Sequence, residues 1–247
     1  MLQNQISNWI KDYTSVYNIK SLVVGVSGGI DSALTSTLCA MTGLPTYCLI
    51  LPIHQNPSHT ERGENHIDWL QSQYDNVHKI KVDLTSTFDT FKSVMGNNDS
   101  ELGFANSRSR LRMVTLYQVA QSKGGIVVGT GNKVEDYGVG FFTKYGDGGV
   151  DISPIADLTK TQVRELSSTL GINQEILDAP PTDGLWDDDR DDQNQIGATY
   201  EELEWVMEWE GDKSILSERQ IEVIGIYNKF HKQNQHKMLP IPVFKNK

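Results

Sequence analysis

Three short segments of the chain carry the residue types that hold phosphate groups. The first, Ser27–Ser32, has the sequence Ser-Gly-Gly-Ile-Asp-Ser and directly follows the apolar run Leu22–Val26. An apolar run, a glycine turn and the start of a helical pattern predict a buried strand, a tight turn and a helix N-terminus. Unpaired backbone N–H groups and the helix dipole at such a turn attract phosphate, and glycines let phosphate oxygens come close. The two serines add hydroxyl donors, so we expect this turn to bind nucleotide phosphates.

The same turn also indicates a metal ion. No lysine follows the glycines, so the turn is not the Gly-Lys-Ser/Thr loop of ordinary nucleotide hydrolases. The carboxylate of Asp31 would repel phosphate unless a divalent cation stood between them, and we therefore expect Mg²⁺ to bind with the nucleotide. The alternative is a glycine turn that only changes the direction of the chain.

The second segment is Gly129–Glu135, which follows the apolar run Ile126–Val128. It again places small residues at the end of a strand, now with a hydroxyl at Thr130 and a carboxylate at Glu135. We expect Thr130 to contact nucleotide and Glu135 to be a second ligand of Mg²⁺, which accepts one or two carboxylates and completes its shell with water and phosphate. A helix-capping turn with a solvent-facing glutamate is the alternative.

The third segment, Phe141–Asp151, holds three glycines within four residues around Asp147. Such a run does not build regular structure and predicts an elaborate loop. Its aromatic residues, one lysine and two aspartates suit a flat, charged ligand, whereas the alternative is a surface loop without a role.

A parallel sheet would bring these segments together. Apolar runs predict strands at Leu22–Val26, Thr46–Leu51, Val77–Val82 and Ile126–Gly129. Helical patterns cover residues 2–17, 31–41, 58–72, 85–95, 108–122, 160–170, 200–210 and 217–233. Strands that alternate with helices predict an α/β, Rossmann-like fold with a mostly parallel sheet, helices on both faces and a mainly helical C-terminal part. The ligand site should then lie at the carboxyl ends of the strands, within one domain that spans residues 1–247.

Composition restricts the class of protein. A formal net charge of −10 argues against a general nucleic-acid surface. No apolar run is long enough to span a membrane, and the first residues lack the basic and apolar regions of a secretory leader, so a cytoplasmic location is expected. Cys39 and Cys48 are predicted to be buried free thiols. The arginines at 108, 110 and 112 are either a solvated helix face or a binding cluster for an anion.

Taken together, the segments resemble the NAD synthetase family, within the ATP pyrophosphatase superfamily that cleaves ATP between its α and β phosphates. The first segment alone matches the superfamily, and the run Lys-Tyr-Gly-Asp-Gly-Gly-x-Asp narrows the match to this family. The resemblance covers nearly the whole chain and rests on Ser27–Ser32, Gly129–Glu135, Phe142–Asp151, Pro154, Lys160-Thr161-Gln162, Pro181-Thr182, Gly197-x-x-Tyr200-x-x-Leu203 and His236-Lys237-x-x-Pro240.

The resemblance implies an activity and a set of partners. The activity is amidation of deamido-NAD with ammonia, driven by ATP through an acyl-adenylate, to give NAD, AMP and pyrophosphate as the last step of NAD biosynthesis. The chain leaves no room for the additional domain of glutamine-dependent members, so free ammonia is expected as the nitrogen source. A homodimer is also implied.

The resemblance further implies the roles of individual residues. The ATP contacts are Gly25, Val26, Ser27, Gly28, Gly29, Ile30, Asp31, Ser32, Thr130, Lys160 and Thr182. The metal ligands are Asp31 and Glu135, which with Lys160 form the catalytic set. The deamido-NAD contacts are Arg110, Lys144, Asp151, His236 and Lys237.

Two features depart from the family pattern. One more residue than in many members separates Glu135 from the aromatic pair Phe141-Phe142, which leaves the bend between them open. The acidic stretch 183–192, behind Pro180-Pro181, is either a solvated loop or a lid over bound nucleotide. Two other functions stay open on the residues alone. One is an enzyme of the same superfamily that adenylates another carboxylate or tRNA, and the other is a nucleotide-binding module without catalysis.

Overall fold

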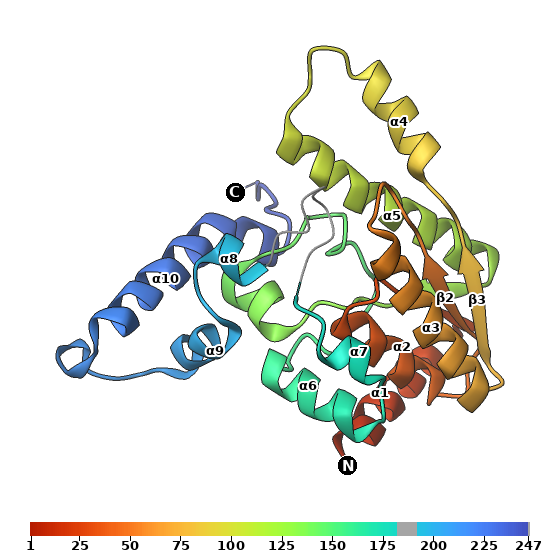
Figure 1. Cartoon of the computed structure of the whole chain (residues 1–247), viewed down its shortest axis with the longest axis horizontal. Coiled ribbons are helices and arrows are strands. Elements are labelled where there is room, and N and C mark those ends of the chain that lie inside the picture. The colour runs from red at the N-terminus through yellow and green to blue at the C-terminus, as the bar shows by residue number, and fades with distance from the viewer. Residues whose placement is uncertain (182–191, 247) are drawn as a thin grey trace.

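A twisted parallel sheet forms the centre of the protein in the computed structural model, which describes residues 1–181 and 192–246 (Figure 1). Within these residues the sheet has the strands β1 (Ser21–Gly25), β2 (Thr46–Ile50), β3 (Val77–Lys81) and β4 (Gly125–Val127). Their order is β3-β2-β1-β4 and every pairing is parallel, for example Val24 with Cys48 and Leu22 with Ile126. The predicted parallel α/β architecture is therefore confirmed.

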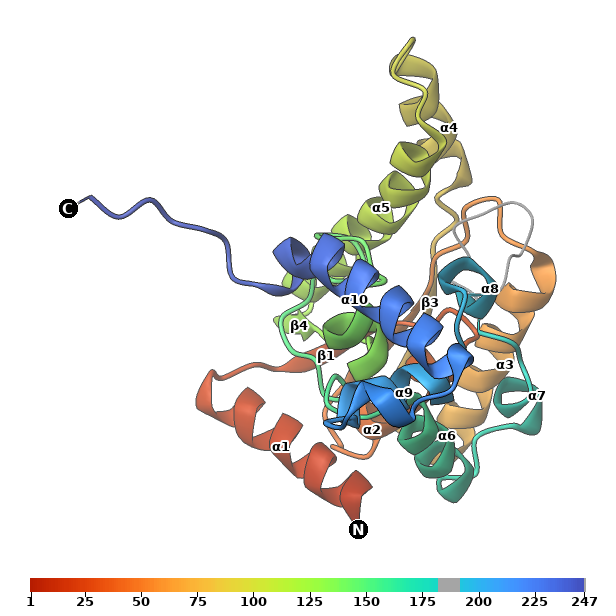
Figure 2. The same ribbon diagram turned by 90° about the vertical axis from the view of Figure 1, so that its left-hand side faces the viewer.

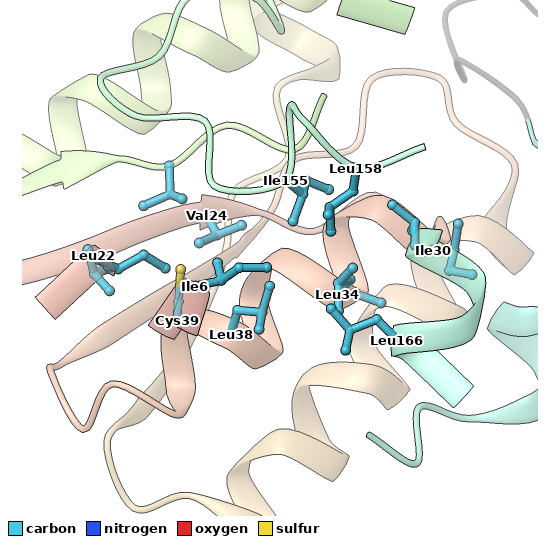
Figure 3. Close-up of a cluster of buried hydrophobic side chains, with 14 of the residues drawn as sticks. Ile6, Leu22, Val24, Ile30, Leu34, Leu38, Cys39, Ile155, Leu158 and Leu166 are labelled. Carbon is cyan, nitrogen blue, oxygen red and sulfur yellow. The ribbon is translucent and has the colours of Figure 1, made fainter. Parts of the chain in front are cut away.

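Helices cover both faces of the sheet, because the central strands β1 and β2 are buried on both sides. Leu22 and Val24 of β1 face a cluster that includes Ile6 of helix α1 and Leu38 of helix α2 (Figure 3). Val23 faces the other way, into a second cluster with helices α4 and α5. The helices are α1 (Leu2–Val16), α2 (Ile30–Ala40), α3 (Pro57–Gln73), α4 (Thr85–Val94), α5 (Glu101–Ser122), α6 (Lys160–Thr169), α7 (Gln174–Leu177), α8 (Asp192–Ile196), α9 (Tyr200–Glu208) and α10 (Glu218–Met238).

The C-terminal part packs around a separate apolar cluster. Helices α9 and α10 lie side by side at one flank of the sheet and enclose η1 (Val134–Val139), a single turn of π-helix (Figures 1 and 2). A short 3₁₀ turn, η2 (Lys213–Ile215), connects α9 to α10. This arrangement confirms the helical character predicted for the C-terminal part. Of the described helices, none is both long and apolar enough to cross a bilayer.

Several element boundaries differ from those predicted. Helix α5 begins at Glu101 rather than at residue 108, because the Ser100 hydroxyl accepts a hydrogen bond from the Gly103 N–H at 3.2 Å and caps an earlier turn. Strand β4 ends at Val127, since Val128 forms only an isolated parallel bridge with Ile152. Because β4 ends before the predicted position, residues 129–133 lie outside the sheet and form a turn at its carboxyl edge.

Candidate active site at the carboxyl edge of the sheet

The turn after β1 is held by the hydroxyls of its two serines. Ser32 Oγ accepts a hydrogen bond from the Ser27 N–H at 3.1 Å and donates to the Gly29 carbonyl at 2.9 Å. Ser27 Oγ lies 3.1 Å from Ser32 Oγ and accepts from the Gly29 N–H at 3.2 Å. Helix α2 starts at Ile30, so its first N–H groups open toward the same edge of the sheet. The turn is thus a preformed anion-binding end of a helix.

Two features of this turn require glycine at position 28: its backbone conformation and the closeness of α3. Its φ of +88° lies in the region that residues with a Cβ rarely adopt. A Cβ at this position would stand 2.4 Å from the carbonyl oxygen of His59 in α3. The backbone of α3 therefore presses directly on the phosphate turn, and a side chain would push the two apart.

A cavity of about 270 Å³ opens above this turn. Its walls come from the ends of β1, β2 and β4, from α3 and α5, and from the start of α6. The predicted ATP contacts that line it are Gly25, Val26, Ser27, Gly29, Ile30, Asp31, Ser32, Thr130 and Lys160. Gly28 is turned against α3 instead, and Thr182 lies outside the described residues, although Pro181 before it reaches the cavity. The structure thus brings the first two predicted segments to one place, and Phe141, Gly146, Asp147 and Val150 of the third segment also line the cavity.

Three charged side chains meet at the wall of this cavity. Lys160 Nζ donates to Asp31 Oδ2 at 2.6 Å and to Glu135 Oε1 at 3.0 Å. The lysine side chain is only 4% exposed, whereas each carboxylate is 18% exposed and faces the cavity. The residues come from α2, η1 and α6, three elements that are far apart in the sequence. The catalytic set predicted from the sequence is therefore one connected cluster.

Burial and mutual attraction set the charge states of this cluster. Burial raises the pKa of Asp31 above its ordinary value, although Lys160 acts in the opposite direction. Burial also acts to raise the pKa of Glu135, but Lys160 and the Tyr200 hydroxyl outweigh it and lower that pKa. For Lys160, burial is outweighed by the two carboxylates, which hold its pKa above the ordinary value. Lys160 is therefore a cation at neutral pH.

Two residues that sequence reasoning missed as site residues hold the carboxylates in place. Asn132, fully buried, donates from Nδ2 to Asp31 Oδ1 at 3.1 Å and accepts from the Glu135 N–H at its Oδ1. Tyr200 donates its hydroxyl to Glu135 Oε1 at 2.6 Å. Tyr200 stands in a motif noted in the sequence, but nothing in its local pattern connects it to Glu135, 65 positions earlier.

The geometry of the two carboxylates fits the predicted Mg²⁺ site. Asp31 and Glu135 accept hydrogen bonds from the same Lys160 nitrogen, so both carboxylates already point toward one positive charge. No group of three or more His, Cys, Asp or Glu side chains suited to a metal occurs among the described residues. Mg²⁺ commonly takes only one or two carboxylates and completes its shell with phosphate and water, which matches a pair that faces a phosphate turn.

The predicted deamido-NAD contacts do not line this cavity, and most are engaged with the backbone. Lys144 Nζ donates to the carbonyl of His236 at 2.8 Å, and the Lys144 carbonyl accepts from Arg110 at 3.2 Å. The Asp151 carboxylate accepts from the Val127 N–H at 2.8 Å and so ties the 141–151 loop to β4. These four residues thus gather around the third predicted segment and join it to α5, to β4 and to the end of α10.

Beside the main cavity is a smaller one of about 130 Å³. Lys237 lines it and donates to the Phe142 carbonyl at 2.7 Å. Asp136 and Asp147 line both cavities and therefore stand at their boundary. Burial, followed by the neighbouring carboxylates, raises the pKa of Asp136 to about 8, and burial also raises the pKa of Asp147. Sequence reasoning noted Asp147 only as a member of the third segment, and it did not single out Asp136, which directly follows Glu135.

A glycine turn at the carboxyl edge of a parallel sheet, with two carboxylates and a lysine above it, defines an α/β protein that binds nucleotide phosphates through its backbone. Comparison with known proteins is more specific. The family model described as NAD synthase matches residues 2–240, and the chain belongs to this family.

Relatives and solved structures agree with this assignment. The NH(3)-dependent NAD(+) synthetase of Finegoldia magna is 34% identical over 237 residues, which is 96% of this chain and 92% of that protein. The enzyme of the same name from Methanosarcina mazei is 38% identical and covers 83% of this chain and 80% of its own. A structure titled NMN synthetase from Francisella tularensis has a TM-score of 0.88 at 32% identity, and the match covers 99% of this chain and 97% of that one.

Proposed function

We propose that the protein catalyses the amidation of deamido-NAD with ammonia, consuming ATP and releasing NAD, AMP and pyrophosphate. Membership of the NAD synthase family and relatives that are NH(3)-dependent NAD(+) synthetases support this reaction. The observation that carries it is the cavity lined by the Ser27–Ser32 turn, Glu135 and Lys160, in which Lys160 bonds to both Glu135 and Asp31 of the turn.

The chemistry explains why these residue types are needed. A carboxylate is a poor electrophile, so an oxygen of the deamido-NAD carboxylate first attacks the α-phosphorus of ATP. The bond from that phosphorus to pyrophosphate breaks and an acyl-adenylate remains. Ammonia then attacks the acyl carbon, loses a proton and expels AMP. The protein's part in the first step is to position the phosphates and offset their charge, which backbone N–H groups and a buried cation do without reorganisation.

Within this reaction, the turn and Lys160 would hold the triphosphate, and Asp31 and Glu135 would hold Mg²⁺. When bound there, the metal ion supplies positive charge against the phosphate oxygens. Lys160 is already a buried cation between the two carboxylates, so it is placed to contact the same phosphates. Thr130 lines the cavity from the turn after β4 and would add a hydroxyl contact to the nucleotide.

The deamido-NAD contacts are assigned to the third segment and its neighbours: Arg110, Lys144, Asp151, His236 and Lys237. Their support is their grouping between α5 and the end of α10, next to the main cavity. Because several of their polar groups are bonded to backbone, they would act by shaping the loop that receives the dinucleotide as well as by contact. Lys144 Nζ lies 5.6 Å from the centre of the Tyr145 ring, and Lys237 Nζ lies 5.0 Å from that of Phe142; these aromatic rings would receive the flat ring of the substrate.

We also infer that the protein acts as a homodimer. The resemblance to the NAD synthetase family implies a dimer, and large apolar side chains that are exposed in the chain, such as Val16, Tyr17 and Val114, could lie in its interface. Light scattering coupled to size-exclusion chromatography tests this inference. A mass of twice one chain supports it, and a single-chain mass at micromolar concentration contradicts it.

The reaction is tested by following NAD formation from deamido-NAD, ATP and Mg²⁺, with ammonium or glutamine as nitrogen source. We expect NAD with ammonium and little with glutamine. Nicotinic acid mononucleotide is supplied in a parallel assay, because the similar Francisella tularensis structure is titled NMN synthetase. Faster turnover of the mononucleotide would reassign the substrate, and tight ATP binding without either product would contradict the proposed reaction.

A further inference from the structure

Tyr200 links the C-terminal helices to the charged cluster. It is the first residue of α9 and is 1% exposed. Its hydroxyl donates to Glu135 Oε1 at 2.6 Å, and its ring lies 4.7 Å from Lys160 Nζ in cation–π geometry. The same oxygen of Glu135 also accepts from Lys160. Tyr200 therefore touches two of the three members of the cluster at once.

The position of Tyr200 is set firmly by its own helix. Thr199 and Glu202 form a reciprocal capping box at the start of α9. Glu202 also accepts two hydrogen bonds from Arg219 of α10, both at 2.7 Å, and Arg219 donates further to the Gly197 carbonyl. Helix α9 begins at a fixed point of the structure, so the tyrosine ring has little freedom to move.

Helix α9 is also joined to the two elements that carry the partners of Tyr200. Glu204 accepts from the Thr161 N–H at 2.9 Å and from the Thr161 hydroxyl at 2.7 Å, at the start of α6 next to Lys160. Val134 and Val139 of η1, on either side of Glu135, pack in the same apolar cluster as Tyr200. Helix α9 thus contacts both the element that carries Lys160 and the element that carries Glu135, and it fixes their relative positions.

We propose that Tyr200 is a positioning residue that sets the side chains of Glu135 and Lys160 for the binding of Mg²⁺ and ATP. Asn132 fixes the backbone of Glu135 from one side, and Tyr200 fixes the carboxylate from the other. Partners that orient a metal-binding carboxylate commonly change metal affinity when they are removed. This inference rests on the proposed metal site.

The test compares Tyr200→Phe with Tyr227→Phe. The first change removes the hydroxyl and keeps the ring beside Lys160. The second removes a hydroxyl from a half-buried tyrosine of α10 that packs against the same apolar cluster and stacks on His231. Each variant is assayed for the Mg²⁺ concentration at half-maximal rate, for the KM of deamido-NAD, and for ATP binding by calorimetry with and without Mg²⁺. The thermal unfolding midpoint is recorded as well.

For Tyr200→Phe we expect the half-saturating Mg²⁺ concentration to rise about tenfold or more. The KM of deamido-NAD should change little, and calorimetry should show weaker binding of ATP only when Mg²⁺ is present. Tyr227→Phe should stay within about twofold of the native protein in each of these measurements, well short of the effect of removing a partner of the carboxylate.

Other results separate the possible failures. A native protein whose rate does not depend on a divalent cation would overturn the proposed metal site. A Mg²⁺-dependent native protein with an unchanged Mg²⁺ requirement in Tyr200→Phe would overturn the role of Tyr200 alone. Equal effects of both substitutions, or a Tyr200→Phe chain that does not fold, would show that the Tyr200 hydroxyl serves only the stability of the fold. Either result would also overturn the proposed role of Tyr200.

Discussion

At the scale of single residues, Asp31 is the carboxylate that connects the charged cluster to the phosphate turn. It shares Lys160 with Glu135 and lies at the first turn of α2, beside the phosphate turn. We expect Asp31→Asn to reduce pyrophosphate release from ATP and deamido-NAD by about 100-fold or more, because a metal ligand and a partner of a buried cation are lost together. Pyrophosphate is measured with Mg²⁺ and without ammonia, so that only the first step is followed.

Asp157→Asn is the matched control for this change. Asp157 is 96% exposed and pairs with Lys133 at the surface, so its loss should leave pyrophosphate release unchanged. A normal rate in Asp31→Asn would remove Asp31 from the proposed catalytic set.

Gly28 allows a second test at the same scale. Gly28→Ala adds a Cβ 2.4 Å from the His59 carbonyl at a φ of +88°, whereas Gly43→Ala has a φ of +77° and open space around it. Gly43→Ala should cost about 1–2 kcal/mol of unfolding free energy from conformation alone. Gly28→Ala should cost more and should also weaken ATP binding. Denaturant unfolding and calorimetry measure both, and equal costs would show that α3 does not constrain the turn.

At the scale of elements, the contact between α2 and α3 predicts that the free energy of unfolding depends on pH. His66 of α3 is buried, its Nε2 lies 3.0 Å from the Ser36 hydroxyl of α2, and burial lowers its pKa to about 4 from 6.5. Between these two values the unfolded chain binds a proton that the folded chain does not. The free energy of unfolding should therefore fall as the pH falls from 6.5 to 4, by about 3 kcal/mol in total.

Unfolding of the native protein and of His66→Gln across pH 4–7 measures this effect. The variant should lose less stability over this range, because glutamine does not titrate. If the free energy of unfolding falls equally with pH in the two proteins, His66 has the same pKa in the folded and the unfolded chain, and the prediction is wrong.

The elements also show what the sequence could predict. The strands, the phosphate turn and the turn with Glu135 follow from local apolar runs and glycines, and the structure places them where a parallel sheet requires. The start of α5 was missed because Gly103 and Asn106 weaken the helical pattern there. The role of Tyr200 was missed because its contact with Glu135 arises only when α9 packs on η1, which is a tertiary effect.

The segment in which the sequence analysis expected an extra residue, between Glu135 and Phe141, forms most of the π-helix η1. The segment after Glu135 forms η1, in which the wider turn of a π-helix takes up more residues than an α-helix does. The Phe141 N–H donates to the Glu135 carbonyl, and Gly140, at a φ of +64°, ends the turn. A π-helix is a form in which an additional residue is accommodated locally, while Glu135 keeps its place beside Lys160.

At the scale of the whole molecule, a protein with a formal net charge of −10 is proposed to bind two anionic substrates at one edge of its sheet. We expect ATP with Mg²⁺, at 100 times its dissociation constant, to stabilise the fold by about 2.7 kcal/mol. For a chain of this size that corresponds to a rise in the unfolding midpoint of roughly 5–10 °C. A thermal scan without deamido-NAD measures this, and no rise in the native protein would contradict the proposed ATP site.

Lys160 also affects whether the chain needs a metal ion in order to fold. In zinc fingers the free energy of metal binding supplies most of the stability of the fold, so the chain stays unfolded until the metal binds. Here the chain provides its own positive charge between Asp31 and Glu135, from a helix that packs on α2 as part of the main core. A newly synthesised chain can thus finish folding whatever the Mg²⁺ level around it, and a chelator would be expected to stop turnover while leaving the fold intact.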